Sequence, residues 1–84
     1  MHRDVKTSNS FVDSHKKWHF LGDWGLGEFY FPKATYKYSV STRAYKAPEL
    51  LLKYTRYTPA IDMWGVGMHL GSYAFQRKQI FGCE

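Results

Sequence analysis

The stretch Met1-His2-Arg3-Asp4-Val5-Lys6-Thr7-Ser8-Asn9 decides how the rest of the chain is interpreted. Two shorter motifs follow it in order, Asp23-Trp24-Gly25 and then Ala47-Pro48-Glu49. Each motif alone is weak, since a His-Arg-Asp triplet arises by chance or in a surface salt-bridge cluster, and proline is common in the first turn of any helix. Three ordered motifs at this spacing make coincidence improbable. These three motifs therefore hold the candidate functional positions.

In this order the motifs resemble the catalytic loop, the metal-binding triplet and the end of the activation segment of protein kinases. Most kinases have phenylalanine in the middle of the triplet, whereas this chain has Trp24. The run from Asp23 to Tyr30 narrows the resemblance to the casein kinase II catalytic (alpha) subunit. The likeness continues through residues 42–51 and 62–64 to Phe81, so it covers nearly the whole chain.

The resemblance implies an α+β fold that is part of a kinase C-lobe and incomplete as an independent domain. Residues 1–23 would form the catalytic loop and the metal-binding hairpin, residues 24–49 the activation segment, and residues 50–84 a helical portion of the C-lobe. The 84 residues contain no Gly-rich phosphate loop, no strand lysine for the ATP phosphates and no hinge for adenine. We therefore expect a kinase fragment, or a truncated copy, in which the ATP pocket is absent.

The roles of four residues follow from the same resemblance. Asp4 would accept or orient the proton of the substrate hydroxyl, and Lys6 would lie close to the transferred phosphate. Asn9 and Asp23 would bind Mg²⁺ and thereby ATP, because Mg²⁺ prefers oxygen ligands and is usually held by one or two carboxylates together with phosphates. The alternative for Asp23 is a turn residue before Trp24. The implied function is transfer of the ATP γ-phosphate to serine or threonine hydroxyls.

Further residues are expected to support this site or to bind substrate. In kinases the aspartate that matches Asp62 ties down the backbone of the His-Arg-Asp loop; the alternative is that Asp62 only occupies the first turn of a helix, near its positive dipole end. Glu49 normally pairs with an arginine from a region outside this sequence. The expected structural support therefore consists of His2, Arg3, Glu49 and Asp62.

Arg43 and Lys46 match basic positions that line the substrate site of casein kinase II. Casein kinase II prefers acidic substrates, so the resemblance implies acidic protein substrates here; the alternative interpretation of the formal net charge of +5 is a solvated positive face. The other expected partners are a regulatory subunit or the remaining kinase lobe. A nucleic-acid partner is disfavoured, because basic residues interleaved with tyrosines occur here without any nucleic-acid-binding motif.

Several residues depart from the casein kinase II pattern. Thr7 stands in place of proline, Ser10 and His19 in place of aliphatic residues, and Gly22 in place of a large apolar residue. In the same way, Ser39 replaces an arginine and Ala44 an aromatic residue. Each lost core side chain costs about 1 to 4 kcal/mol of stability. The alternative function is therefore a catalytically inactive, truncated kinase remnant that acts at most as a protein-binding fragment.

Local patterns predict two structured regions. Residues 10–13 and 18–21 are short apolar runs around a polar connection, which predicts a β-hairpin with Asn9 at its entrance and Asp23 at its exit. Residues 24–46 show no periodicity, as expected of a long activation segment. Thr58 as cap and Pro59 in the first turn predict a helix that runs to about Phe75. That helix is apolar nearly all round, which predicts that it is buried.

Composition and length exclude several classes of protein. Apolar residues make up 44% and aromatic residues 19% of the chain, far more than a disordered tail carries. Cys83 is the single cysteine and the N-terminus has no secretory signal, so we expect the cytoplasm or nucleus. Residues 63–75 are uncharged but too few to span a bilayer. His15 and His19 have i, i+4 spacing, which suits zinc only on a helix, and this stretch is a predicted hairpin.

Overall fold

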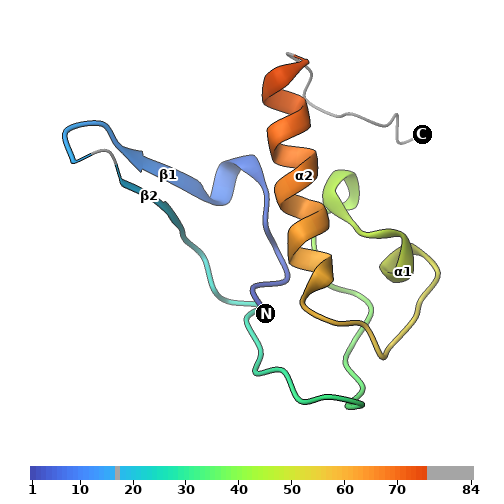
Figure 1. The fold of residues 1–84 in the computed structure, drawn as a ribbon. Helices are drawn as coiled ribbons and strands as arrows, with labels where there is room; N and C mark the ends of the chain where they lie inside the picture. Colours follow the sequence, from blue (N-terminus) through green and yellow to red (C-terminus); the bar gives the residue numbers. More distant parts are fainter. Residues whose placement is uncertain (17, 76–84) are drawn as a thin grey trace.

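The structure, a computed structural model, describes residues 1–16 and 18–75. Its elements in chain order are the 3-10 turn η1 (Thr7–Asn9), strands β1 (Ser10–Asp13) and β2 (Trp18–Leu21), a second 3-10 turn η2 (Arg43–Tyr45), and helices α1 (Pro48–Leu51) and α2 (Ala60–Ala74). A two-stranded antiparallel sheet and one long helix make a small α+β structure. Figure 1 shows the hairpin on one side of α2 and α1 on the other, with the N-terminus near the beginning of α2.

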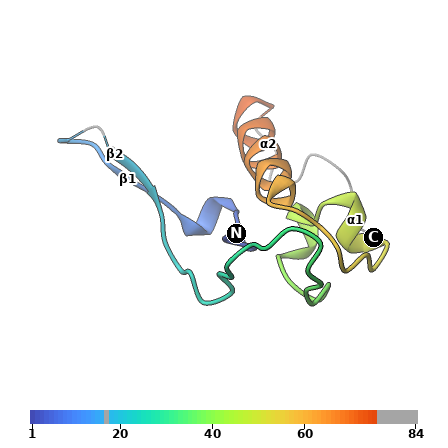
Figure 2. The same cartoon turned by 60° about the horizontal axis from the view of Figure 1, so that its bottom comes forward.

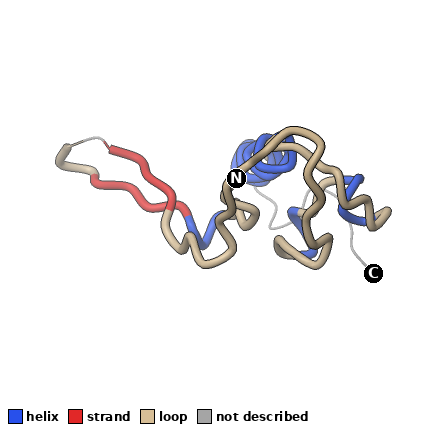
Figure 3. The backbone as a smooth tube through the Cα atoms, turned by 90° about the horizontal axis from the view of Figure 1, so that it is seen from below, coloured by secondary structure: helices blue, strands red, loops and turns tan. Residues whose placement is uncertain are grey.

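The hairpin prediction is confirmed with its bounds. Ser10 pairs with Leu21, and Phe11 pairs with Phe20, whose rings stack with centroids 5.7 Å apart. Asp13 closes the turn, because its Oδ1 accepts hydrogen bonds from the backbone N–H groups of the second and third residues after it. Figure 3 shows the two strands projecting away from the helices, so most hairpin side chains are exposed.

The segment from residue 24 to residue 46 is irregular, as predicted, apart from the single turn η2. Figure 2 shows it running from the hairpin, past the N-terminus, to the part of the molecule where α1 lies. Backbone hydrogen bonds hold it at two points: Met1 and Glu28 exchange a pair of them, and Tyr36 donates to Thr55 at 2.8 Å. The segment is thus anchored to the N-terminus and to the chain before α2.

Helix α2 begins one residue later than predicted, with Pro59 as its cap residue, and ends at Ala74. Thr58 still serves the start of the helix, because its hydroxyl accepts a hydrogen bond from the N–H of Ala60 at 3.2 Å. The prediction of a fully buried helix is wrong. The described elements pack on one face only, formed by Ile61, Gly65 and Met68. Side chains on other faces are largely exposed: Met63 is 67%, Leu70 61% and Tyr73 84% accessible.

The core lies where the end of the irregular segment meets α1 and the first turn of α2. Its buried members are Val40, Ala47, Leu50, Tyr57 and Ile61. Gly65 extends the contact toward the N-terminus: a Cβ at this position would lie 2.9 Å from the backbone oxygen of Val5. Glycine therefore permits a close approach between α2 and the Met1–Asn9 stretch.

Residues 76–84, the last part of the predicted helical portion, lie outside the described residues. Within the described ranges, no helix combines the length and the hydropathy that crossing a bilayer requires.

Candidate active site

The backbone of the His2–Asn9 loop is fixed by one carboxylate from α2. The N–H of His2 donates to Asp62 Oδ2 at 2.7 Å, and the N–H of Arg3 donates to Asp62 Oδ1 at 2.8 Å. Asp62 also lies in the first turn of α2, where a carboxylate is favoured by the helix dipole. Asp62 therefore both binds the backbone of the loop and occupies the first turn of the helix, so the two interpretations given from the sequence hold together. Arg3 has φ of 70°, a strained value for a non-glycine residue, and the two bonds hold the chain in that conformation.

The imidazole of His2 joins the loop to the end of the hairpin. Its side chain is almost completely buried, at 1% accessibility. Nδ1 accepts a hydrogen bond from the N–H of Asp4 at 3.1 Å, and Nε2 lies 2.8 Å from the carbonyl oxygen of Gly22. Because an amide only donates and a carbonyl only accepts, the ring must carry its proton on Nε2. Trp24 packs edge-on against the same ring at 4.5 Å.

Asp4 is surrounded by three polar groups. Its Oδ1 accepts a hydrogen bond from the hydroxyl of Thr42 at 2.9 Å, and its Oδ2 lies 3.3 Å from Asn9 Nδ2 and 3.8 Å from Lys6 Nζ. Lys6 Nζ donates in turn to Thr42 Oγ1 at 2.9 Å. The structure thus brings Asp4, Lys6 and Asn9 together. A carboxylate that accepts a hydrogen bond from a hydroxyl at this distance has the geometry of a general base.

Thr42 was not singled out as a site residue from the sequence. It lies 38 positions from Asp4, and only its place directly before Arg43 in the kinase-like run pointed to it. A contact of this kind depends on how the irregular segment folds back, which has no local signal.

The two proposed magnesium ligands lie at neighbouring backbone positions. Asn9 is buried, and its Nδ2 donates to the backbone oxygen of Asp4 at 2.8 Å, which leaves Oδ1 as its atom for a metal. Gly22 N–H donates to the backbone oxygen of Asn9 at 2.8 Å, so Asp23 follows directly after this pairing. Asp23 is exposed, has φ of 51°, and its Oδ1 lies 3.4 Å from the N–H of Gly25.

This donor set suits a hard cation. It offers one carboxylate and one amide oxygen, the ligands that Mg²⁺ takes when phosphates complete its coordination. The positive φ of Asp23 and its contact with Gly25 equally suit a turn residue, so both interpretations stay open. Across the described parts of the chain, no three His, Cys, Asp or Glu side chains are grouped as a metal site.

The proposed substrate-binding residues follow Thr42 directly. Arg43 is exposed at the beginning of η2, and Lys46, half-buried, ends that turn. Glu49 lies half-buried in the first turn of α1. The chain therefore presents two basic residues within four positions of the hydroxyl that contacts Asp4.

Residues 1–82 match the family model described as the protein kinase domain. This chain belongs to the protein kinase family. The match covers almost the entire sequence, including the loop, the hairpin, the irregular segment and α2. Kinases of this family transfer a phosphoryl group and generally use ATP with Mg²⁺.

In this kinase chain, a buried tyrosine links the His2–Asn9 loop to the irregular segment. Arg3 Nη1 donates to the hydroxyl of Tyr57 at 2.9 Å, and that hydroxyl donates to the backbone oxygen of Lys37 at 2.6 Å. Arg3 Nε also donates to the backbone oxygen of Leu26 at 2.7 Å. Two points of the irregular segment, Leu26 and Lys37, are thereby held to the His2–Asn9 loop.

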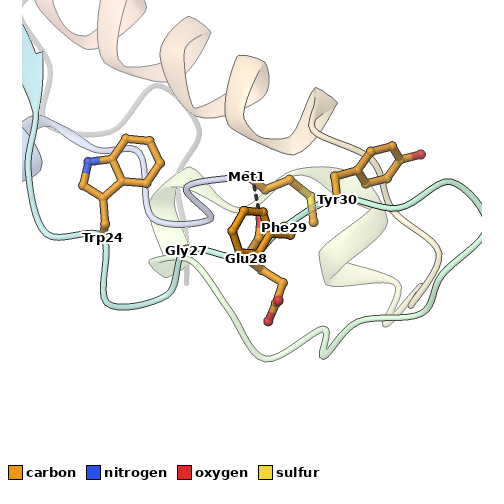
Figure 4. Close-up of a pocket in the computed structure, with 6 residues that line it drawn as sticks. All are labelled: Met1, Trp24, Gly27, Glu28, Phe29 and Tyr30. Atoms are coloured by element: carbon orange, nitrogen blue, oxygen red, sulfur yellow. Dashed lines mark hydrogen bonds between the residues drawn. The ribbon is translucent and has the colours of Figure 1, made fainter.

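A cavity of about 540 Å³ opens beside the N-terminus of the kinase chain (Figure 4). Its lining consists of Met1, Trp24, Gly27, Glu28, Phe29 and Tyr30. Phe29 is 80% accessible, and none of the proposed catalytic or magnesium-binding side chains faces this space. The cavity therefore lies between Met1 and the start of the irregular segment and gives no support for a nucleotide site.

Proposed function

We propose that this sequence supplies the catalytic-loop part of a serine/threonine protein kinase of the casein kinase II type. The proposed reaction is transfer of the ATP γ-phosphate to serine or threonine hydroxyls of acidic protein substrates. The single observation that carries the proposal is the hydrogen bond from the Thr42 hydroxyl to Asp4 Oδ1 at 2.9 Å. It supports a role for Asp4 with aliphatic hydroxyls, because the same oxygen would meet a substrate hydroxyl at general-base distance.

In the proposed mechanism, Asp4 orients the substrate hydroxyl and takes its proton as the oxygen attacks the γ-phosphorus and ADP leaves. Lys6 would then lie beside the transferred group, where its ammonium stabilises negative charge on the phosphate oxygens. Asn9 and Asp23 would hold Mg²⁺, which neutralises phosphate charge when bound. Asp62 and His2 would keep the loop in place through the contacts described above.

The proposed preference for acidic substrates rests on Arg43 and Lys46. Both follow Thr42 closely, so a peptide whose hydroxyl reaches Asp4 would extend past two cationic side chains. The net charge of +5 acts in the same direction. The proposed site of action is the cytoplasm or nucleus, and the further proposed partners are a regulatory subunit or the remaining kinase lobe.

The test uses the cellular polypeptide that carries this sequence. It is captured with an antibody against residues 33–46, its intact mass is measured, and transfer of labelled γ-phosphate to an acidic serine peptide is followed. We expect a mass several-fold above 9.9 kDa and clear labelling, and a loss of about 10² to 10⁴ in rate in the variant Asp4→Asn. The control Asp13→Asn, at the end of β1, should keep full activity. Labelling that Asp4→Asn does not change would contradict the role of Asp4.

The competing proposal is an inactive remnant that binds proteins. It is favoured by the exposed apolar side chains of α2, namely Met63, Leu70 and Tyr73, which bear no charge. An intact mass near 9.9 kDa, with no labelling and with a co-captured kinase, would support it. The purified 84-residue chain itself is expected to transfer no phosphate, because its sequence has no Gly-rich loop or strand lysine for ATP.

A further inference from the structure

Two histidines that are 50 residues apart in sequence meet where the hairpin touches α2. The ring centroids of His19 on β2 and His69 on α2 are 6.2 Å apart. The Oγ of Ser10 hydrogen-bonds with Nε2 of His19, and Oγ1 of Thr7 lies 3.0 Å from Nδ1 of His69. The hydroxyl of Tyr45 completes the group at 2.9 Å from Thr7 Oγ1.

This cluster gathers three of the departures from the casein kinase II pattern. Thr7, Ser10 and His19 each replace an apolar residue, and the proposed phosphoryl transfer uses none of them. Scattered decay would leave such replacements with unrelated partners. Here Thr7 contacts His69 and Ser10 contacts His19. The third replacement, His19, is itself one of the two histidines.

The hydrogen bonds leave one nitrogen of each ring for another ligand. In metal sites a histidine typically binds the ion with one nitrogen while the other donates to a nearby oxygen, which fixes the tautomer. Ser10 and Thr7 provide such oxygens for His19 Nε2 and His69 Nδ1. Among the described residues, no hydrogen bond is made by His19 Nδ1 or His69 Nε2.

The separation of the rings fits a shared ion. Metal–nitrogen distances of about 2.0 to 2.1 Å place two imidazole centroids about 5 to 6.5 Å apart, and the observed separation is 6.2 Å. A cavity of about 290 Å³ lies between the hairpin and α2, and both histidines line it. Its other walls are mainly apolar, with Phe20, Leu21 and Leu70 among them, and Lys6 also lines it, with its ammonium turned to Thr42 and Asp4.

We propose that His19 and His69 together bind one divalent transition-metal ion that prefers imidazole, such as Zn²⁺, Ni²⁺ or Cu²⁺. Water fills the remaining coordination positions, since the described residues place no third His, Cys, Asp or Glu beside the pair. The site is separate from the proposed Mg²⁺ ligands Asn9 and Asp23, whose donors are oxygens. Its effect is to join the projecting hairpin to α2, and an isolated two-stranded hairpin is marginally stable without such support.

The test uses the full 84-residue chain with Cys83→Ser, because a thiol would itself bind these metals. Zn²⁺ is titrated while thermal unfolding is followed, since an ion that binds only the folded state raises Tm. We expect Tm to rise in this protein and in the control His15→Gln, which removes a histidine from the exposed turn. His19→Gln and His69→Gln should each weaken the apparent affinity for Zn²⁺ at least about tenfold. The double variant with both His19→Gln and His69→Gln should lose no more affinity for Zn²⁺ than either single variant.

Variants in which Zn²⁺ raises Tm as much as in the parent protein would overturn the proposal. It would also be overturned if each single variant lost half of the rise in Tm and the double variant lost all of it, because the two histidines would then bind Zn²⁺ independently. A measurement on the parent protein covers the case in which a variant does not fold. Substoichiometric Cu²⁺ should broaden the ring proton signals of His19 and His69 together and leave His15 sharp. Broadening of only one of the pair, or of His2 alone beside the N-terminal amine, would place the metal elsewhere and refute the shared site.

Discussion

Replacement of Asp62 by asparagine is the most direct test of how the His2–Asn9 loop is held. The carboxylate accepts two backbone hydrogen bonds, from His2 at 2.7 Å and from Arg3 at 2.8 Å. Hydrogen bonds to a charged group contribute about 1.5 to 3 kcal/mol each. Asparagine keeps one oxygen but turns an NH₂ group toward an N–H, so we expect Asp62→Asn to lower the free energy of unfolding by about 2 to 4 kcal/mol.

Urea denaturation followed by tryptophan fluorescence measures this loss. With a slope of about 1 kcal/mol per molar urea, suitable for a small chain, the midpoint should fall by about 2 to 4 M. A chain of this length has a total stability of about 4 to 12 kcal/mol, so at the lower end of that range the variant is close to unfolding in water.

The matched control is Asp13→Asn. Asp13 also accepts two backbone N–H bonds, but both come from its own turn in the exposed hairpin. Its replacement should change the unfolding free energy by less than about 1 kcal/mol. If the two variants had equal midpoints, or if Asp62→Asn matched the parent chain, the carboxylate would not hold the loop in solution.

Further predictions concern packing and the link to the activation segment. Tyr57→Phe removes a buried hydroxyl with two hydrogen-bond partners and should cost about 1 to 3 kcal/mol in urea denaturation, whereas Tyr54→Phe, at an exposed tyrosine, should be neutral. Gly65→Ala places a Cβ 2.9 Å from a backbone oxygen of the catalytic loop and should destabilise by about 1 to 3 kcal/mol. Gly67→Ala meets nothing within 4 Å and should stabilise by about 1 kcal/mol, because alanine is the better helix former. A thermal unfolding comparison in which the two glycine variants shift Tm in the same direction would contradict this packing.

Local patterns predicted the regular elements well. The hairpin has the predicted bounds because its apolar runs and polar turn act over only a few residues. Helix α2 starts one residue after the predicted position, since Pro59 takes the cap position and Thr58 supports it from outside. Its burial was predicted wrongly, because composition reveals how apolar a helix is but not how many elements cover it.

The contacts of the candidate site were harder to predict. That Asp62 reaches the loop followed from a family resemblance, not from any spacing in the chain. The bonds from Thr42 to Asp4 and from Tyr57 to Lys37 depend on the path of an irregular segment, which carries no periodicity. His19 and His69 meet because the base of the hairpin comes close to α2, a contact that no local spacing in the sequence predicts.

The contact between His2 and Asp62 also sets the order in which the molecule can form. The two residues are 60 positions apart, and closing a loop of that length costs about 3.6 kcal/mol in chain entropy. The hairpin needs no such closure, so it can form as soon as its own residues are available. During synthesis the residues proposed to carry the chemistry are made before α2, which follows them in the sequence. They acquire their final arrangement only after α2 has been made and has folded back onto them.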